Sequence, residues 1–189
     1  MERAACIVAA AGRSSRMGEW KLLLPFRGST IIQTVVEAAL PACSRVLLVT
    51  GYRGAELSRL FGGKPHVVLV DNPDWELGMF SSIQRAAWDV DTDRFFITLG
   101  DKPLITAEVY RALLAAEPAD AVIAAFDGAW GHPVLCSARV RNAILKEDPA
   151  SGTMKDIVSR FTVREVPWRD SSVLADVDTP REYSALFRT

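Results

Sequence analysis

The chain has 189 residues, of which 49% are hydrophobic and 24% are charged, with a formal net charge of −1 at pH 7. This length suits one domain over residues 1–189, and the composition is that of a packed core and excludes wholesale disorder. The near-neutral charge gives no general attraction to nucleic acid or to anionic membranes, so neither is expected as a partner, and any phosphate-binding patch has to be local.

Short apolar runs alternate with helical patterns through the first two thirds of the chain. The runs are typical of fully buried strands, at 4–10, 45–51, 66–70, 95–100 and 121–126. Helical patterns lie between them, at 31–40, 54–61, 79–88 and 107–116. Thr30 and Gln33 have the spacing of a capping box at the start of the first helix. This alternation predicts parallel strands joined by helical crossovers.

The rhythm changes after residue 127. Strand-like stretches and helical patterns now follow one another as 132–137, 138–146, 152–159 and 161–167. The last helix is signalled by Thr179 as N-cap, Pro180 in the first helical position and Glu182 two residues later. We therefore expect a three-layer α/β domain with a mostly parallel sheet and a mixed C-terminal extension.

The stretch VAAAGRSSRMGEWK runs from the first predicted strand into a loop. Ligands of open parallel sheets bind beyond the carboxyl ends of the strands, and Gly12 lies at such an end. Gly12 and Gly18 allow a bulky anion close to the backbone, and Arg13 or Arg16, together with Lys21, could surround phosphates. The stretch fits neither the P-loop nor the dinucleotide pattern. From composition alone, a solvated loop with a few cations is the alternative.

Two carboxylates stand at informative places. Asp101 directly follows the strand predicted at 95–100, and Asp178 comes just before the last helix. Two carboxylates beside a triphosphate suit Mg²⁺, which prefers oxygen ligands and keeps several waters. The alternative for Asp101 is a turn residue at the end of the strand, and for Asp178 a local turn or cap.

The pattern G-x-S-x-R-M-G-x-x-K after two alanines resembles the nucleotide-binding signature of the MobA-like nucleotidyltransferases, which include molybdenum cofactor cytidylyltransferases and guanylyltransferases. Further segments in the same order carry the resemblance along the chain: NPDWELGMFSSI at 72–83, LGDKP at 99–103, GHPV at 131–134 and DVDTP at 176–180. The resemblance implies a Rossmann-like nucleotidyltransferase fold and an enzyme.

The resemblance also implies roles for single residues. The catalytic candidates are Lys21, Arg16 and Asp101. The nucleotide-binding candidates are Ala10, Ala11, Gly12, Arg13, Ser14, Arg16, Lys21, Gly78, Ser81 and Ser82, with a polar position at an ordinary helix start as the alternative for Ser81 and Ser82. Asp101 and, less firmly, Asp178 are the metal candidates. Lys102 and His132 are the acceptor-binding candidates, and Lys102 departs from the family, where Gln is common.

The reaction implied is a Mg²⁺-dependent transfer of CMP from CTP to the phosphate of molybdopterin, with release of pyrophosphate. The cytidylyl branch has alanine before the loop glycine where the guanylyl branch has glycine, and this chain reads Ala10-Ala11-Gly12. We hypothesise that the methyl group of Ala11 narrows the pocket against a purine. CTP and a molybdopterin-type acceptor are thus the expected partners, with a molybdoenzyme as a further one.

Three other functions stay open. The acceptor could instead be a sugar phosphate or methylerythritol phosphate. The chain could also be a non-catalytic accessory protein that holds molybdenum cofactor. A nicotinamide-dependent oxidoreductase would share the α/β architecture, but the first loop lacks the dinucleotide fingerprint.

The cysteines and tryptophans are read mainly as packing residues. Cys6, Cys43 and Cys136 are odd in number and far apart, which is typical of buried small side chains in a reducing cytoplasm. No apolar run is long enough to cross a membrane, and the N-terminus does not fit a signal peptide. Trp20, Trp75 and Trp130 lie near glycine-bearing turns; we expect them to pack, with stacking on a ligand ring as the alternative.

Overall fold

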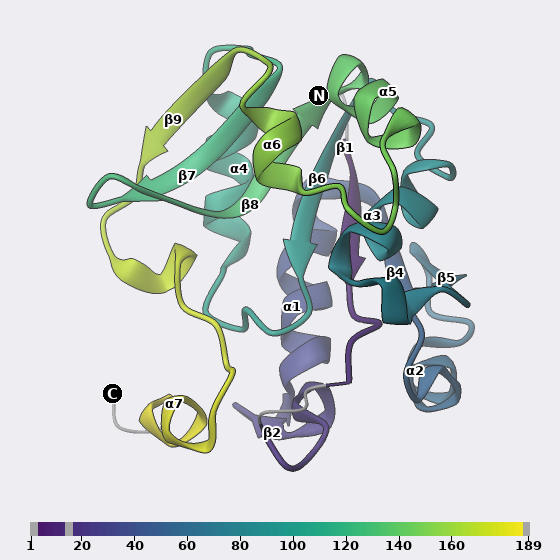
Figure 1. Ribbon diagram of the computed structural model, residues 1–189. Coiled ribbons are helices and arrows are strands. Elements are labelled where there is room, and N and C mark those ends of the chain that lie inside the picture. Colours follow the sequence, from purple (N-terminus) through teal and green to yellow (C-terminus); the bar gives the residue numbers. More distant parts are fainter. Residues whose placement is uncertain (1–3, 14–16, 187–189) are drawn as a thin grey trace.

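The computed structural model describes residues 4–13 and 17–186. Within them, one sheet has the strand order β5-β4-β1-β6-β8-β7-β9 (Figure 1). Its strands are β1 (Ala4–Ala9), β4 (Cys43–Thr50), β5 (Val67–Asp71), β6 (Arg94–Leu99), β7 (Ala121–Phe126), β8 (Ala129–Ser137) and β9 (Val163–Pro167). All pairs are parallel except β6–β8 and β7–β8. The predicted fold class is confirmed, including the mixed C-terminal extension.

Helices cover both faces of this sheet. They are α1 (Ile31–Ala39), α2 (Gly54–Phe61), α3 (Met79–Ala87), α4 (Ala107–Ala115), α5 (Ala138–Lys146), α6 (Met154–Val158) and α7 (Pro180–Ala185). Alternation along β1 sends Cys6 and Val8 toward α1, α2 and α4, whereas Ala5 and Ile7 face α3, α5 and α6. This two-sided burial makes three layers. Among the described residues, no helix is both long and apolar enough to cross a bilayer.

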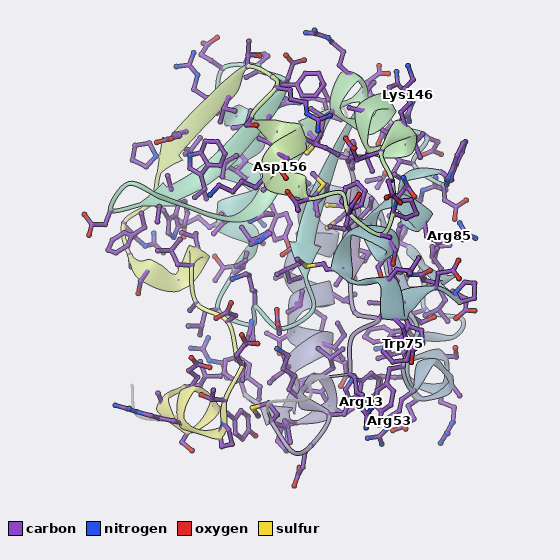
Figure 2. The ribbon with its side chains drawn as sticks, viewed as in Figure 1. Arg13, Arg53, Trp75, Arg85, Lys146 and Asp156 are labelled. Carbon is purple, nitrogen blue, oxygen red and sulfur yellow. The ribbon has the colours of Figure 1, made fainter. Side chains whose placement is uncertain are left out.

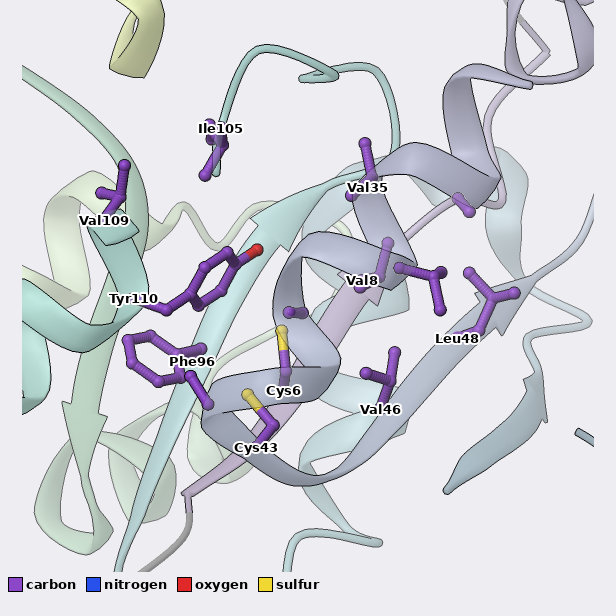
Figure 3. Close-up of a cluster of buried hydrophobic side chains, with 14 of the residues drawn as sticks. Cys6, Val8, Val35, Cys43, Val46, Leu48, Phe96, Ile105, Val109 and Tyr110 are labelled. Carbon is purple, nitrogen blue, oxygen red and sulfur yellow. The ribbon is translucent and has the colours of Figure 1, made fainter. Parts of the chain in front are cut away.

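The core on the α1 side holds two of the three cysteines (Figure 3). Cys6, Cys43 and Cys136 are all free thiols and all buried, as predicted. Burial raises the pKa of Cys136 to about 12, so its thiol stays protonated and acts as a small apolar group. The rings of Phe96 and Tyr110 meet edge to face, with centroids 5.0 Å apart. Burying an apolar side chain of this size contributes roughly 1.5–3 kcal/mol to the free energy of folding, so this pair helps to stabilise the packing of α4 on the sheet.

The predicted helix starts differ in how completely they form. The hydroxyl of Thr30 accepts from the backbone N–H of Gln33 at 3.3 Å. The Gln33 side-chain oxygen lies 2.9 Å from that hydroxyl, so it accepts from the side chain rather than from the Thr30 backbone, and only half of the expected box exists. At α7 the box is complete, because Thr179 caps the N–H of Glu182 and the Glu182 carboxylate accepts from the Thr179 backbone at 2.8 Å.

The strand predicted at 66–70 forms, but the prediction that it is fully buried was wrong. The strand expected to be fully buried at 66–70 is β5, which lies at the edge of the sheet and pairs only with β4. Its Val68 side is therefore uncovered, and Val68 is 40% exposed. The short antiparallel pair β2 (Pro25–Phe26) and β3 (Ser29–Thr30) was not predicted, since two-residue strands carry no alternation to recognise.

The C-terminal strap, residues 174–186, runs past the end of β6 to the region of β2 (Figure 1). The backbone N–H of Val177 donates to the carbonyl of Asp101 at 3.1 Å. The hydroxyl of Tyr183 donates to the carbonyl of Pro25 at 2.7 Å. Val177 is also buried in a small apolar cluster with Phe26 from β2. These contacts bring the segment before α7 to the carboxyl ends of β1 and β6.

Candidate active site

A cavity of about 380 Å³ opens where β1 and β6 end. We call it the polar cavity; it is lined by Ala9, Ala10, Ala11, Gly12, Arg13, Lys21, Leu22, Trp75, Glu76, Gly78, Met79, Ser82, Leu99, Gly100, Asp101 and Asp178. The chain builds β4 and β5 to one side of β1 and β6 to the other, so this is the switch point of the sheet. Open α/β sheets bind ligands at this place.

Lys21 lies between two carboxylates in this cavity. Its ammonium is 2.6 Å from Oδ2 of Asp101 and 2.6 Å from Oδ1 of Asp178. The 3-10 helix Lys21–Leu23 carries it, and its side chain is only 11% exposed. Burial pulls the pKa of Lys21 down, but the charge of Asp101 and the hydrogen bonds to both carboxylates outweigh burial and raise it. Lys21 is therefore a fixed cation at neutral pH.

Asp101 and Asp178 have the chemistry to hold a divalent cation. One oxygen of Asp101, Oδ1, is buried and has no hydrogen-bond partner, so the carboxylate keeps an acceptor position unused by the protein. Among the described residues, no group of three or more acidic, histidine or cysteine side chains gathers as a metal cage. Mg²⁺ suits such a site, because it is commonly held by one or two carboxylates and completed by waters and substrate phosphates.

The first loop forms one wall of the polar cavity. Ala10, Ala11, Gly12 and Arg13, which the sequence analysis expects to bind the nucleotide, all line it. The indole N–H of Trp20 donates to the carbonyl of Gly12 at 3.1 Å, which ties the far end of the loop back to its beginning. The predicted binding residues Ser14 and Arg16 lie outside the described residues.

The segment before α3 forms the opposite wall. Gly78 and Ser82 line the cavity, and Gly78 has φ +114°, a backbone conformation that favours glycine. Buried Asn72 donates to the hydroxyls of Ser81 and Ser82 at 3.1 and 3.0 Å. The Ser81 hydroxyl donates onward to the Gly78 carbonyl at 2.8 Å, and Ser81 does not line the cavity. Ser81 thus stabilises the turn at Gly78 from behind the cavity wall, whereas Gly78 and Ser82 face the cavity.

Trp75, which the sequence analysis expects to pack, with stacking on a ligand ring as the alternative, lines the polar cavity. A side-chain carbon at Gly51 would come within 2.7 Å of Trp75 and 2.9 Å of the Ala11 methyl group, so the three positions are in close contact. Glu76 and Met79 also line the cavity and were not predicted. The only signal for them was their place within NPDWELGMFSSI, which does not say which side chains face inward.

A second, apolar cavity of about 530 Å³ adjoins the first. The two share Met79 and Leu99. The apolar cavity is lined by Met79, Ile83, Ile97, Leu99, Ile123, Gly128, Trp130, Gly131, His132, Val134, Met154, Lys155 and Val158. Burial, together with the positive charge of Lys102, lowers the pKa of His132 to about 4. Its buried Nδ1 has no hydrogen-bond partner, so a neutral imidazole faces an apolar space.

Lys102 is not brought into either of these cavities. Its side chain is 4% exposed, and its ammonium donates to the carbonyl of Leu174 at 2.9 Å. Asp176 of the C-terminal strap lies 3.7 Å from the same ammonium. Lys102 therefore holds the C-terminal strap beside Asp101. Its positive charge also contributes to the low pKa of His132.

The chain matches one protein-family model and several proteins of known sequence. A family model described as a MobA-like NTP transferase domain matches residues 6–166. The molybdenum cofactor cytidylyltransferase of Escherichia coli K12 is 34% identical over 178 residues, which cover 94% of this chain and 92% of that protein. A protein named nicotine blue oxidoreductase, from Paenarthrobacter nicotinovorans, is 30% identical over 191 residues, covering 92% and 91%.

The fold is also found in solved structures. A crystal structure of a protein from Mycobacterium tuberculosis H37Rv superposes with a TM-score of 0.82 at 26% identity, covering 99% of both chains. Another structure of that protein, with a TM-score of 0.78 at 23% identity and full coverage of both chains, is a complex with manganese. The α/β architecture derived above is therefore shared along essentially the whole chain.

Proposed function

Because the chain belongs to the MobA-like NTP transferase family and is a nucleotidyltransferase of that type, we propose that it transfers CMP from CTP to the phosphate of molybdopterin. The observation that carries this proposal is the placement of Lys21 within 2.6 Å of both Asp101 and Asp178, in a cavity beside Gly12 and Arg13. Cations and carboxylates set at a glycine-bearing loop suit a nucleoside triphosphate with its metal.

The reaction needs no strong base. An oxygen of the acceptor phosphate attacks the α-phosphorus of CTP, and a new phosphorus–oxygen bond forms. The bond from the α-phosphorus to the bridging oxygen breaks, and pyrophosphate leaves with that electron pair. A phosphate monoester is largely ionised near pH 7, so the attacking oxygen carries its charge already. The protein therefore acts by orienting the two substrates in line and by stabilising charge.

The residues of the polar cavity divide this work. Lys21 and Arg13, with Arg16 from the first loop, would hold the triphosphate, and the loop N–H groups beyond Gly12 would add hydrogen bonds. Asp101 and Asp178 would hold Mg²⁺, for which the unpartnered Oδ1 of Asp101 supplies a ligand oxygen. When bound, that ion would offset the charge that develops on the phosphates.

The nucleotide base is assigned to the side of the cavity formed by Ala11, Trp75, Gly78 and Ser82. The Ala11 methyl group is close to Trp75, as the approach of both to Gly51 indicates. A purine needs more room here than a pyrimidine, so we favour CTP over GTP. Comparable affinities for CTP and GTP in a calorimeter would contradict this preference.

The acceptor is assigned to the apolar cavity. Its shared border with the polar cavity, at Met79 and Leu99, would let an acceptor phosphate reach the α-phosphorus while its ring lies among apolar side chains. His132 supports this assignment, because its neutral imidazole has a buried Nδ1 available to an acceptor hydrogen-bonding group. Lys102 would contribute indirectly, by keeping His132 neutral.

The deciding experiment uses the whole protein with Mg²⁺, each of the four nucleoside triphosphates in turn, and molybdopterin. We expect a product with the mass of the cytidine dinucleotide form and one pyrophosphate per product. Product from a sugar phosphate or methylerythritol phosphate, but not from molybdopterin, would assign another acceptor. Cofactor binding without pyrophosphate release would identify an accessory protein, for which a molybdoenzyme is the proposed partner. The buried free thiols fit a reducing cytoplasm.

An oxidoreductase is the second candidate, because one relative at 30% identity carries that name. The sequence of the first loop does not favour it, since Ser14 and Met17 stand where a G-x-G-x-x-G fingerprint beginning at Gly12 would have its second and third glycines. The two reactions are separated by their products. Oxidation of a reduced nicotinamide cofactor, with no pyrophosphate from any nucleoside triphosphate, would support the oxidoreductase.

A further inference from the structure

A third cavity lies between residues 18–24 and the turn at Tyr52 and Arg53 that precedes α2. We call it the arginine cavity; it has a volume of about 600 Å³ and is lined by Arg13, Gly18, Glu19, Trp20, Leu23, Leu24, Tyr52 and Arg53. Arg13, Gly18, Glu19 and Trp20 belong to the stretch that follows the first strand, whereas Tyr52 and Arg53 belong to none of the sequence motifs. Arg13 lines both this cavity and the polar cavity, so the two adjoin at that side chain. Figure 2 shows Arg13 next to Arg53 in this region of the molecule.

Both arginines of this cavity rest on aromatic rings. The guanidinium carbon of Arg13 is 5.9 Å from the ring centre of Tyr52, and that of Arg53 is 5.1 Å from the ring of Trp20. The two rings contact each other edge to face, with centroids 6.1 Å apart. A guanidinium stacked in this way keeps its N–H groups at the edge, where they are available to a phosphate.

Arg53 is held in place by its backbone and by the partly buried carboxylate of Glu56. It has φ +54°, directly before α2, in the left-handed region that bulky residues rarely adopt. Its guanidinium pairs with Glu56, and the contact from Nη2 measures 2.7 Å. The Arg53 side chain is 42% exposed, so this ion pair contributes little and an incoming phosphate can compete for the guanidinium. Glu19 also lines the cavity and opposes anion binding there.

The three cavities follow one another in a fixed order. The apolar cavity meets the polar cavity at Met79 and Leu99, and the polar cavity meets the arginine cavity at Arg13. In-line displacement places the attacking oxygen and the leaving group on opposite sides of the phosphorus. An acceptor in the apolar cavity therefore directs the leaving group away from that cavity, toward Arg13.

From this order we infer that the arginine cavity is the pyrophosphate subsite, with Arg53 and Arg13 as its binding residues. The inference rests on the proposed nucleotidyl transfer and extends it to the leaving group. Arg13 contacts the phosphates first, because it lines both cavities. Arg53 then takes the detached pyrophosphate, exchanging its bond to Glu56 for charge-assisted bonds to phosphate oxygens.

The test compares binding of inorganic pyrophosphate and of CMP by calorimetry, in the presence of Mg²⁺. For Arg53→Gln we expect the dissociation constant for pyrophosphate to rise at least tenfold, with that for CMP unchanged, because CMP lacks the two departing phosphates. Arg53→Lys should lose less, since it keeps the charge but not the planar fork. The matched control is Arg59→Gln; Arg59 is an exposed arginine of the helix α2, which follows Arg53, and it lines none of the three cavities.

Equal pyrophosphate affinity in the wild-type protein and in Arg53→Gln would overturn the inference, and so would an equal loss of CMP affinity. Failure here is distinct from failure of the proposed function, which is read from pyrophosphate release during turnover. A protein that releases pyrophosphate but binds it independently of Arg53 keeps the function and loses only this subsite.

Discussion

The ammonium of Lys21 lies 2.6 Å from Oδ2 of Asp101, although 80 positions separate the two residues in the chain. Two strand ends bring them together, because Lys21 belongs to the loop after β1 and Asp101 directly follows β6, its parallel neighbour. Lys21 thus occupies the position between the carboxylates of Asp101 and Asp178 that we propose for a divalent metal. Lys21 therefore has to release at least part of this contact when a metal and its nucleotide bind.

Replacing Lys21 with methionine should separate metal binding from turnover. Without its ammonium, Asp101 and Asp178 repel each other, so Mn²⁺ should bind at least fivefold more tightly in the absence of nucleotide. Turnover should nevertheless fall at least tenfold, because the triphosphate loses its lysine. Mn²⁺ affinity can be measured by electron paramagnetic resonance and turnover by pyrophosphate release. Lys146→Met, an exposed change on α5, is the control; unchanged values for both quantities in Lys21→Met would contradict the site.

Asp101→Asn should abolish most of the activity and leave the fold intact. The amide keeps the shape of the carboxylate but removes its charge, so metal affinity and turnover should each fall at least tenfold. The loss of the ion pair to Lys21 is partly compensated, since Asp178 remains within 2.6 Å of that ammonium. Thermal unfolding by circular dichroism should shift by only a few degrees. Near-normal turnover in Asp101→Asn, beside a normal Glu117→Gln control, would remove Asp101 from the catalytic residues.

Ala11→Gly should relax the choice of nucleotide. The Ala11 methyl group stands in the wall formed with Trp75 and Gly51, and its loss leaves room for a larger base. We expect the ratio of CTP affinity to GTP affinity to fall at least fivefold, measured by calorimetry on one preparation. Loss of stability affects both nucleotides alike and so cancels from the ratio. A ratio that does not change would mean that Ala11 takes no part in base selection.

His132 should make the protein less stable in mild acid. Burial and the charge of Lys102 hold its folded-state pKa at about 4, below the value of 6.5 expected when unfolded. Above pH 6.5 both states are neutral and His132 has no effect. As the pH falls from 6.5 toward 4, only the unfolded state gains the proton, so the free energy of unfolding drops by up to about 3 kcal/mol.

Denaturant unfolding of the wild-type protein and His132→Gln at several pH values measures this effect. The variant should lose less stability between pH 6.5 and 4 than the wild-type protein does. Parallel curves for the wild-type protein and His132→Gln would show that His132 titrates normally.

Much of the site could be predicted because it lies at the ends of strands. Apolar runs mark β1 and β6 clearly, and the residues that follow a parallel strand gather at one edge of the sheet, which is why Gly12, Lys21 and Asp101 were found. The cap of α7 was equally legible, since Thr179 and Glu182 interact within one turn. These features could be predicted because they depend on residues that are close together in the sequence.

Other features depend on contacts between distant segments and could not be derived from local pattern. Lys102 was expected to reach the acceptor, yet it is buried against the carbonyl of Leu174 in a strap more than 70 positions away. The position of Asp178 beside Lys21 depends on the same strap, and only the family resemblance pointed to it. Arg53 belongs to no sequence motif. Its place in the arginine cavity depends on stacking against Trp20, which lies on a different loop.

The position of Asp178 in the C-terminal strap determines when the candidate site is completed during translation. Strands β1, β4 and β6 are complete long before Asp178 is translated, so the nascent sheet can form while Lys21 still has only Asp101 for a partner. The second carboxylate, Asp178, is added only after every strand of the sheet has been translated. A chain cut just before residue 178 would therefore keep its sheet yet lose half of the proposed metal-binding pair.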